Sequence, residues 1–515
     1  MNLPLSLFRP LCCSLILAAT LLYQAGGSAE LRTATSSSQT PYLVPATPNW
    51  RVTALLTVGD APPGSSEYRM AGVPDGLGAM SGYFENNRYI ADPGYMTVWM
   101  NHEIPLEAGG VRSHGQPGAF VSEWTLALDP LRVIKGQDLV RRIFSWDETA
   151  QQWADSTGKT GFSRFCSADL PPLTAFYDPR SGKGYLGRLF LHGEEEKKAG
   201  RAWAHVVLGT ERGHSYQLPA LGRFAWENAV AHPYAGDKTL VIGLDDDTPG
   251  EIYVYIGEKR HQGNPVERAG LHGGKLYGVK VKDLPLEQSP ISGRFTLEDL
   301  SAWAMGPGVA LDAAARAQGV TAFARPEDGS WDTQHPRRFY FATTGASVAG
   351  KAQQARLYRL TFDSLSEPTG GLIEHIVEAS SLIGPDGQAA RYFDNLTIDR
   401  EGRVVIQEDP GKDPRLAKIW RIDPTRTPYD PQFAEVLAEA DPARFLPDAP
   451  QFLTIDEEHS GIIDVTDWLR AAPWVLPYQR YYLGVTQAHY PIETPKDKEL
   501  VQGGQLYLLE GPVAK

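Results

Sequence analysis

Short runs of β-branched and aromatic residues recur along almost the whole chain, and this feature restricts the fold most. Each run is bounded by Gly, Pro, Asn or Asp, which favour turns. Residues 239–257 and 337–362 each contain a strand, a polar turn and a second strand, the pattern of an antiparallel pair. Further runs that we expect to be strands are Tyr95–Met100, Glu123–Leu128, Gly187–Leu191, His205–Gly209, Lys275–Val281, Arg403–Gln407, Lys418–Ile422 and Gln505–Leu509.

Antiparallel sheets that repeat in this way need protected edges, and a β-propeller provides them by arranging its sheets in a ring. The sequence therefore predicts an all-β protein, a β-propeller with short helical insertions. Helical spacing is confined to residues 297–303, 309–318 and 432–439. No exact repeat at a fixed period is present, and no linker divides the chain. We therefore expect a single propeller domain over residues 30–515.

The first residues have the pattern of a secretory signal peptide. Arg9 precedes an apolar run from Leu11 to Tyr23, and small residues follow up to Ala29. This predicts a signal peptide over residues 1–29 and a periplasmic or secreted protein. The single arginine is typical of export as an unfolded chain, with metal loaded afterwards. No later stretch is apolar over the length of a bilayer, so we expect no stable membrane insertion.

The composition excludes some partners and favours metal cations. The net charge is −13 and the pI is near 5.5, so no basic footprint for nucleic acid or an anionic membrane is present. Nothing in the sequence indicates a protein partner. Clustered carboxylates suit hard cations such as calcium.

Cys166 is the single cysteine that remains after removal of the predicted signal peptide, because Cys12 and Cys13 lie within it. An intrachain disulfide is therefore excluded. A lone thiol in an oxidising compartment is either buried and inert or a metal ligand, and we favour the buried interpretation.

Acidic residues stand next to apolar strand residues at several places. Trp226 precedes Glu227, and Phe393 precedes Asp394. Since an unpaired buried carboxylate is costly, such groups should be paired with a metal ion or an arginine. Oxygen ligands alone favour calcium, whereas a thiolate admits iron. No P-loop, nucleophile elbow or zinc-site spacing is present. The histidines at 102, 192, 459 and 489 are candidate bases, but each lies beside polar loop residues, so we favour ordinary loop histidines.

These segments together resemble the PhoX family of exported bacterial alkaline phosphatases. The resemblance covers most of the chain in the order of the family. It is carried by GVPDGLGAM, WMNHE, LFLHGEEE, GRFAWENA, LVIGLDDDTPGEIYVY, LHGGKLYGVKV, ARPEDG, YFDNLTIDREGRVVIQED and DEEHSGIIDV.

The resemblance implies a six-bladed propeller that holds iron and calcium ions in its channel and hydrolyses small phosphoester substrates. It implies an iron site with Glu194 or Glu195, Glu327 and Asp394. Two departures stand out. The family's double glutamate is flanked by cysteine and asparagine, whereas this sequence reads His192-Gly193-Glu194-Glu195-Glu196, and Phe393 replaces a proline before Asp394. Arg325 would bind the substrate phosphate. The calcium candidates are Glu227, Asp246, Asp247 and Asp409, and Cys166 is a further candidate metal ligand.

Two alternative functions compete with the phosphatase. One is a calcium-dependent lactonase or esterase, and the other is a non-catalytic propeller that calcium stabilises. For Arg325 the alternative role is a salt bridge to a nearby acid such as Asp328.

Overall fold

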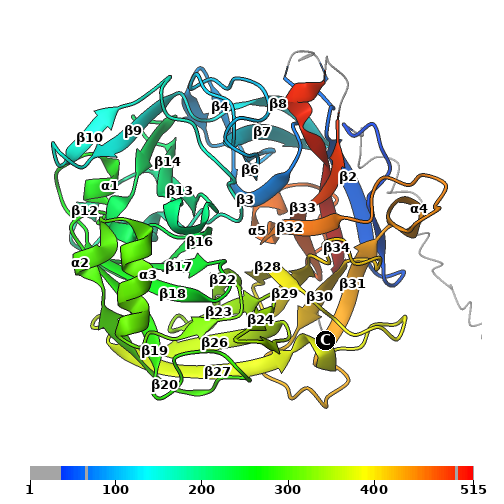
Figure 1. Cartoon of the computed structure of the whole chain (residues 1–515). Coiled ribbons are helices and arrows are strands. Elements are labelled where there is room, and N and C mark those ends of the chain that lie inside the picture. Colours follow the sequence, from blue (N-terminus) through cyan, green and yellow to red (C-terminus); the bar gives the residue numbers. More distant parts are fainter. Residues whose placement is uncertain (1–35, 64–67, 493–496, 514–515) are drawn as a thin grey trace, which may run out of the picture.

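The computed structural model describes residues 36–63, 68–492 and 497–513. The predicted signal peptide, residues 1–29, lies outside these residues. The described chain forms a ring of β-sheet blades around a common centre, as Figure 1 shows. The predicted all-β propeller is therefore confirmed. No helix within the described ranges is long and apolar enough to cross a bilayer.

Six blades can be traced in the described part of the chain, and we number them in chain order. Blade one contains β3 (Pro74–Ser81), β6 (Tyr95–His102), β7 (Phe120–Leu128) and β8 (Leu131–Asp138). Blade two contains β13 (Arg188–Gly193), β14 (Ala202–Leu208), β15 (His214–Gln217), β9 (Arg142–Asp147) and β10 (Gln152–Asp155). Bridges from Phe165 to Glu194 and from Asp169 to Leu191 place the segment 165–169 against β13.

Blades three and four share one sheet, because their outer strands β20 and β27 pair with each other. Blade three contains β16 (Trp226–Ala231), β17 (Lys238–Asp245), β18 (Gly250–Glu258), β19 (Lys275–Val281) and β20 (Gly293–Asp299). Blade four contains β22 (Pro326–Trp331), β23 (Arg338–Thr343), β26 (Arg356–Phe362) and β27 (Gly370–Glu378). The two predicted hairpins are confirmed as β17 with β18 and β23 with β26.

The last two blades take their outer strands from the start of the described chain. Blade five contains β28 (Phe393–Ile398), β29 (Val404–Glu408), β30 (Lys418–Ile422), β31 (Ala434–Ala440) and β1 (Leu43–Pro45). Blade six contains β32 (Glu457–Asp464), β33 (Gln479–Pro491), β34 (Gln502–Pro512) and β2 (Arg51–Thr57). The two ends of the chain therefore close the ring.

Apolar side chains fill the interfaces between neighbouring blades. Blades one and two pack through a cluster that includes Trp99 and Trp203, and blades six and one through a cluster that includes Leu483 and Trp124. Comparable clusters lie at the other four interfaces. Burial of these side chains from both blades at once holds the ring together.

Short elements decorate the blades. Small hairpins join β4 (Tyr83–Glu85) to β5 (Arg88–Ile90), β11 (Tyr177–Asp178) to β12 (Lys183–Gly184), and β24 (Ser347–Val348) to β25 (Lys351–Ala352), and β21 (Ala322–Phe323) pairs with β18. The helices are α1 (Pro265–Arg268), α2 (Ser301–Ala304), α3 (Gly308–Ala317), α4 (Pro442–Phe445) and α5 (Thr466–Leu469).

The predicted helices are right in part. Residues 309–318 correspond to α3, but β20 continues to Asp299 before the single turn of α2. Residues 432–439 are wrong as a helix, because they form β31 between β30 and β1. Their apolar spacing fits both periods, and strand pairing on both sides decides between them.

Candidate metal centre

Five innermost strands begin with the same local structure. The second residue of β3, β16, β22, β28 and β32 is acidic in each case, and the ladder to the neighbouring strand shifts register within the next few residues. A β-bulge of this kind bends the strand and redirects its side chains. The acidic residues at this position are Asp75, Glu227, Glu327, Asp394 and Glu458.

Blade two presents a cysteine at the equivalent position. Phe165 forms a β-bridge with Glu194 in blade two, and Phe393 pairs with Glu408 in the same way in blade five. Cys166 follows Phe165 as Asp394 follows Phe393, so the two residues are equivalent. We call these six residues the first set; they are Asp75, Cys166, Glu227, Glu327, Asp394 and Glu458.

A second set of side chains comes from the neighbouring strand of each blade. In every blade a residue of the neighbouring strand, at or near its end, donates its backbone N–H to the carbonyl two residues before the first-set residue, at 2.8 to 3.1 Å. The second set is Glu103, Glu195, Asp246, Thr344, Asp409 and His489. The two sets together bring nine carboxylates and one thiol to the middle of the ring.

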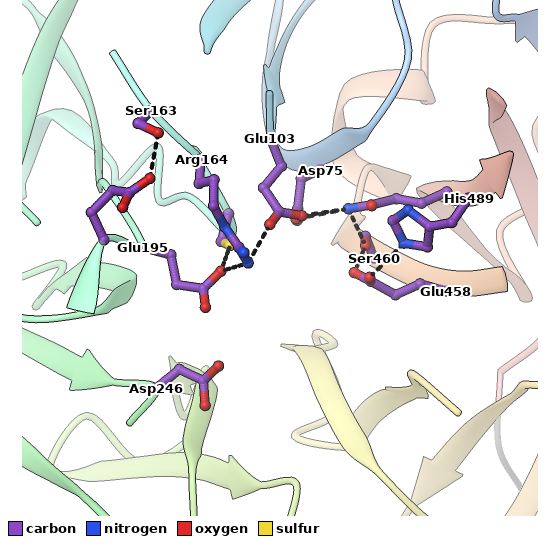
Figure 2. Close-up of polar contacts among 12 residues, drawn as sticks. Asp75, Glu103, Ser163, Arg164, Glu195, Asp246, Glu458, Ser460 and His489 are labelled. Atoms are coloured by element: carbon purple, nitrogen blue, oxygen red, sulfur yellow. Dashed lines mark hydrogen bonds and ion pairs between the residues drawn. The ribbon is translucent and has the colours of Figure 1, made fainter. Parts of the chain in front are cut away.

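Three groups of these side chains lie close enough to share a cation. They are Asp75, Glu103 and Cys166; Glu227, Glu327 and Asp394; and Asp394, Asp409 and Glu458, with ligand atoms within 4.8 Å of one another in each group. Asp394 belongs to the second and third groups, so these two groups are contiguous. Figure 2 shows Asp75 and Glu103 converging from one side and Glu195 from another.

The carboxylates repel one another in the absence of cations. Burial, followed by the charges of neighbouring acids, raises the pKa of Asp75, Glu227 and Asp394 well above the usual range. Burial also raises the pKa of Glu195 to about 8, although Arg164 opposes the change. The pKa of Asp409 rises to about 7 for the same first reason.

Few cationic side chains balance this charge. Arg164 pairs with Glu103 at 2.8 Å and with Glu195, and Arg325 pairs with Asp246 at 2.8 Å and with Glu327 at 3.1 Å. Burial alone would lower the pKa of His489, but its hydrogen bonds to Glu458 and Gln502 and the charges of Glu458 and Glu103 together raise it to about 10.

The donor set fits metal ions. The nine carboxylates of the two sets face two arginines and one histidine, and Asp75 Oδ1 is a buried acceptor with no donor within the described ranges. Carboxylate oxygens suit calcium, and the thiol beside Asp75 and Glu103 adds a soft donor that suits iron.

Most of the predicted site residues meet in these sets. Cys166, Glu195, Glu227, Asp246, Glu327, Asp394 and Asp409 all belong to them. Cys166 is both buried, as expected, and close to carboxylates, since its thiol donates to Glu195 Oε2 at 3.2 Å.

Two predicted residues point elsewhere. Glu194 receives both arms of Arg201, each at 2.6 Å, which satisfies its carboxylate within blade two. Asp247 pairs with Lys198 at 3.1 Å, and Asp245 and Asp312 share that lysine. Of the two glutamates, Glu195 is therefore the one that faces the centre, and Asp247 is paired with Lys198.

Sequence reasoning did not select Asp75, Glu103, Glu458 and His489. A signal for Asp75 is present, because Pro74-Asp75 matches Pro326-Glu327 at the start of an inner strand. The histidines were misjudged as loop residues: His102, His192 and His459 are fully buried in strands. His489 is near a strand end and joins the second set.

Arg325 contacts residues other than the expected one. The salt-bridge alternative named Asp328, but Asp328 binds Asn228 at 2.6 Å and the Leu396 amide at 3.1 Å. Arg325 instead binds Asp246 through two nitrogens, both at 2.8 Å. Its backbone is left-handed, with φ of 61°, so a turn and not an extended strand brings its side chain to Glu327.

Comparison with known families supports one interpretation of this centre. Residues 210–426 match the family model described as alkaline phosphatase PhoX. The resemblance to the PhoX family is confirmed. The matched segment contains Glu227, Asp246, Arg325, Glu327, Asp394 and Asp409. No curated protein sequence matches the chain.

Among solved structures, PhoX from Pseudomonas fluorescens in complex with vanadate, a transition state analogue, is 13% identical, with a TM-score of 0.58, over 93% of this chain and 98% of its own. At this identity the likeness to PhoX establishes the fold. An apocarotenoid oxygenase mutant from Synechocystis is 11% identical over 87% of this chain and 77% of its own, with a TM-score of 0.31, too low to indicate a shared fold.

Proposed function

We propose that this protein is an exported, metal-dependent phosphomonoesterase of the PhoX type. The observation that carries the proposal is the PhoX family match over the segment that contains Arg325, Glu327 and Asp394, which lie together at the centre of the propeller. The related Pseudomonas protein binds vanadate, a transition state analogue. The family match favours phosphate esters over the lactones and carboxylic esters of the alternative function.

The three carboxylate groups would hold the metal ions, calcium at the all-oxygen groups and iron at the group with Cys166. When bound, such ions polarise the phosphoryl group and lower the pKa of water. Arg325 is half-exposed, so its guanidinium can bind phosphoryl oxygens that enter from solvent. Asp246 and Glu327 fix its direction, and Thr344 donates its hydroxyl to Glu327 and so orients that carboxylate.

The direct test is hydrolysis of p-nitrophenyl phosphate by protein purified without added metals, together with elemental analysis. We expect turnover that vanadate inhibits and that chelation abolishes. Bound metal without turnover of any phosphomonoester would contradict the proposal and would favour a binding propeller.

Replacement of Arg325 by lysine should lower phosphomonoester turnover by roughly ten- to a hundredfold, because lysine keeps the charge but loses the two-pronged donor. Metal content should stay unchanged. Arg201→Lys is the matched control, since Arg201 also pairs with a buried glutamate but lies outside both sets. Turnover that is equal in both variants would show that Arg325 does not bind the phosphoryl group.

Replacement of Cys166 by serine should reduce bound iron and remove any thiolate-to-iron absorption band, because a hydroxyl is a poor substitute for a soft donor. Calcium content should change little. Ser167→Ala, which alters the next residue, is the control. If the serine variant keeps its iron and its spectrum, Cys166 is a packing residue and not a ligand.

A further inference from the structure

Arg164 occupies the position in blade two that Arg325 occupies in blade four. Each stands two residues before a first-set residue, Cys166 and Glu327 respectively. Each accepts a backbone hydrogen bond from the second set, Arg164 from Glu195 at 2.9 Å and Arg325 from Thr344 at 3.1 Å. The equivalent residues of the other blades are Val73, Ala225, Tyr392 and Asp456, none of which is a cation.

Both arginines have a left-handed backbone, with φ of 42° for Arg164 and 61° for Arg325. A residue with a Cβ rarely adopts this conformation, and it persists where the surrounding contacts fix it. Val73 and Tyr392 share this turn, so it recurs among the blades and places the two arginines at equivalent positions of the ring.

Both guanidinium groups lie between buried carboxylates and solvent. The side chain of Arg164 is 42% exposed, whereas Glu103 and Glu195 are 12% and 15% exposed. The side chain of Arg325 is 34% exposed, whereas its partners Asp246 and Glu327 are almost fully buried. An anion that approaches the centre from solvent meets these two cations first.

The two arginines bracket neighbouring acids of the second set. Arg164 pairs with Glu195, Arg325 pairs with Asp246, and the charge of Asp246 acts on Glu195. Figure 2 shows Arg164 extended toward Glu195 and Glu103, with Asp246 beyond Glu195. The two guanidinium groups therefore flank adjacent acids of the second set.

We propose that Arg164 is a second phosphate-binding arginine, which with Arg325 favours dianionic phosphomonoesters over monoanionic diesters. This inference rests on the proposed function. A monoester has three non-bridging oxygens and two negative charges, so two guanidinium groups and the metal ions can all engage it. A diester has two non-bridging oxygens and one charge, so the second arginine contributes less to its binding.

The test uses the full-length, metal-loaded protein and the variants Arg164→Lys and Arg164→Gln. The readouts are kcat/KM for p-nitrophenyl phosphate and for bis(p-nitrophenyl) phosphate, the Kd of inorganic phosphate by calorimetry, and metal content. Arg223→Lys is the matched control, because Arg223 is also partly exposed and pairs with Glu148 outside the centre.

We expect Arg164→Lys to lower monoester kcat/KM and to raise the phosphate Kd by about tenfold or more, with less than about a threefold effect on the diester. Metal content should match that of Arg223→Lys. An equal loss for both esters together with loss of metal would overturn the inference, because Arg164 would then merely neutralise Glu103 and Glu195.

The outcomes separate this inference from the proposed function. Phosphate binding that depends on Arg164, without hydrolysis of either ester, would support the inference and refute the function. Monoester hydrolysis that Arg164→Lys leaves unchanged would refute the inference alone. A protein that neither binds phosphate nor hydrolyses esters would refute both.

Discussion

Replacement of Asp394 by asparagine is expected to remove most of the bound metal and to lower turnover by more than about a hundredfold. Loss of a residue that only hydrogen-bonds to a metal ligand lowers activity by up to about a hundredfold, and loss of a ligand itself should cost more. Asp394 belongs to two of the three carboxylate groups, so its loss disturbs both. Asparagine keeps the shape of the side chain but removes its charge. Elemental analysis and a phosphomonoester assay on the same sample would measure the effect.

Asp247→Asn is the matched control for this experiment. Asp247 was also a candidate ligand from the sequence, but it pairs with Lys198 outside the two sets. This variant should keep its metal and its activity. Full metal content in Asp394→Asn, or loss of metal in Asp247→Asn, would contradict the assignment of the centre.

Chelation is expected to destabilise the protein far more at pH 8.5 than at pH 5.5. In the metal-free protein the folded-state pKa values of Glu195 and Asp409 are about 8 and 7, above the ordinary values of 4.5 and 3.8. The folded state therefore binds more protons than the unfolded state between these values. This contribution to stability is complete below the unfolded pKa and is lost as the pH rises through the folded pKa.

The size of the effect follows from the number of groups. Each pKa unit corresponds to about 1.4 kcal/mol, so several raised carboxylates together should contribute a few kcal/mol after allowance for solvent screening. Glu458 acts in the opposite direction, because its pKa is lowered: burial opposes the change, but the hydrogen bonds from His489 and Ser460 and the charges of His489 and Arg164 together outweigh it. Its contribution is lost at acid pH, so the comparison stays above pH 5.

Thermal unfolding with and without chelator at the two pH values would test this prediction. Addition of calcium at pH 8.5 should restore the melting temperature, since bound cations replace the protons that the carboxylates have lost. A melting temperature that chelation leaves unchanged at pH 8.5 would contradict the metal-centred interpretation.

The strands could be predicted from the sequence because most are short, apolar and bounded by turn residues. Lys275–Val281 and Lys418–Ile422 coincide with β19 and β30. Residues 432–439 could not be assigned, since the deciding contacts come from β1, almost 400 residues earlier in the chain.

The candidate site could be predicted only in part. Trp226-Glu227 and Phe393-Asp394 showed that carboxylates would be buried, but not which blades would bring them together. A shift of one residue decides which of the two glutamates faces the centre. Glu194 pairs with Arg201 inside blade two, whereas Glu195 pairs with Arg164 at the centre. Cys166 could not be equated with the acids of the other blades, since two isolated bridges place its segment against β13.

Closure of the ring by the chain ends couples completion of the polypeptide to assembly of the metal centre. β2 pairs with β34, and Tyr42 donates its backbone N–H to Gln505, so blade six acquires its outer strand from residues made more than 400 positions earlier. Asp75 and Glu458 come from the first and last blades and face each other only after this pairing. The last side chain of the two sets, His489, precedes β34, but blade six, which carries Glu458 and His489, stays incomplete until this final strand has been synthesised, and β2 meanwhile has an unpaired edge. We expect high-affinity metal binding to require the complete chain. Truncation before β34 should leave a protein that aggregates and binds little metal.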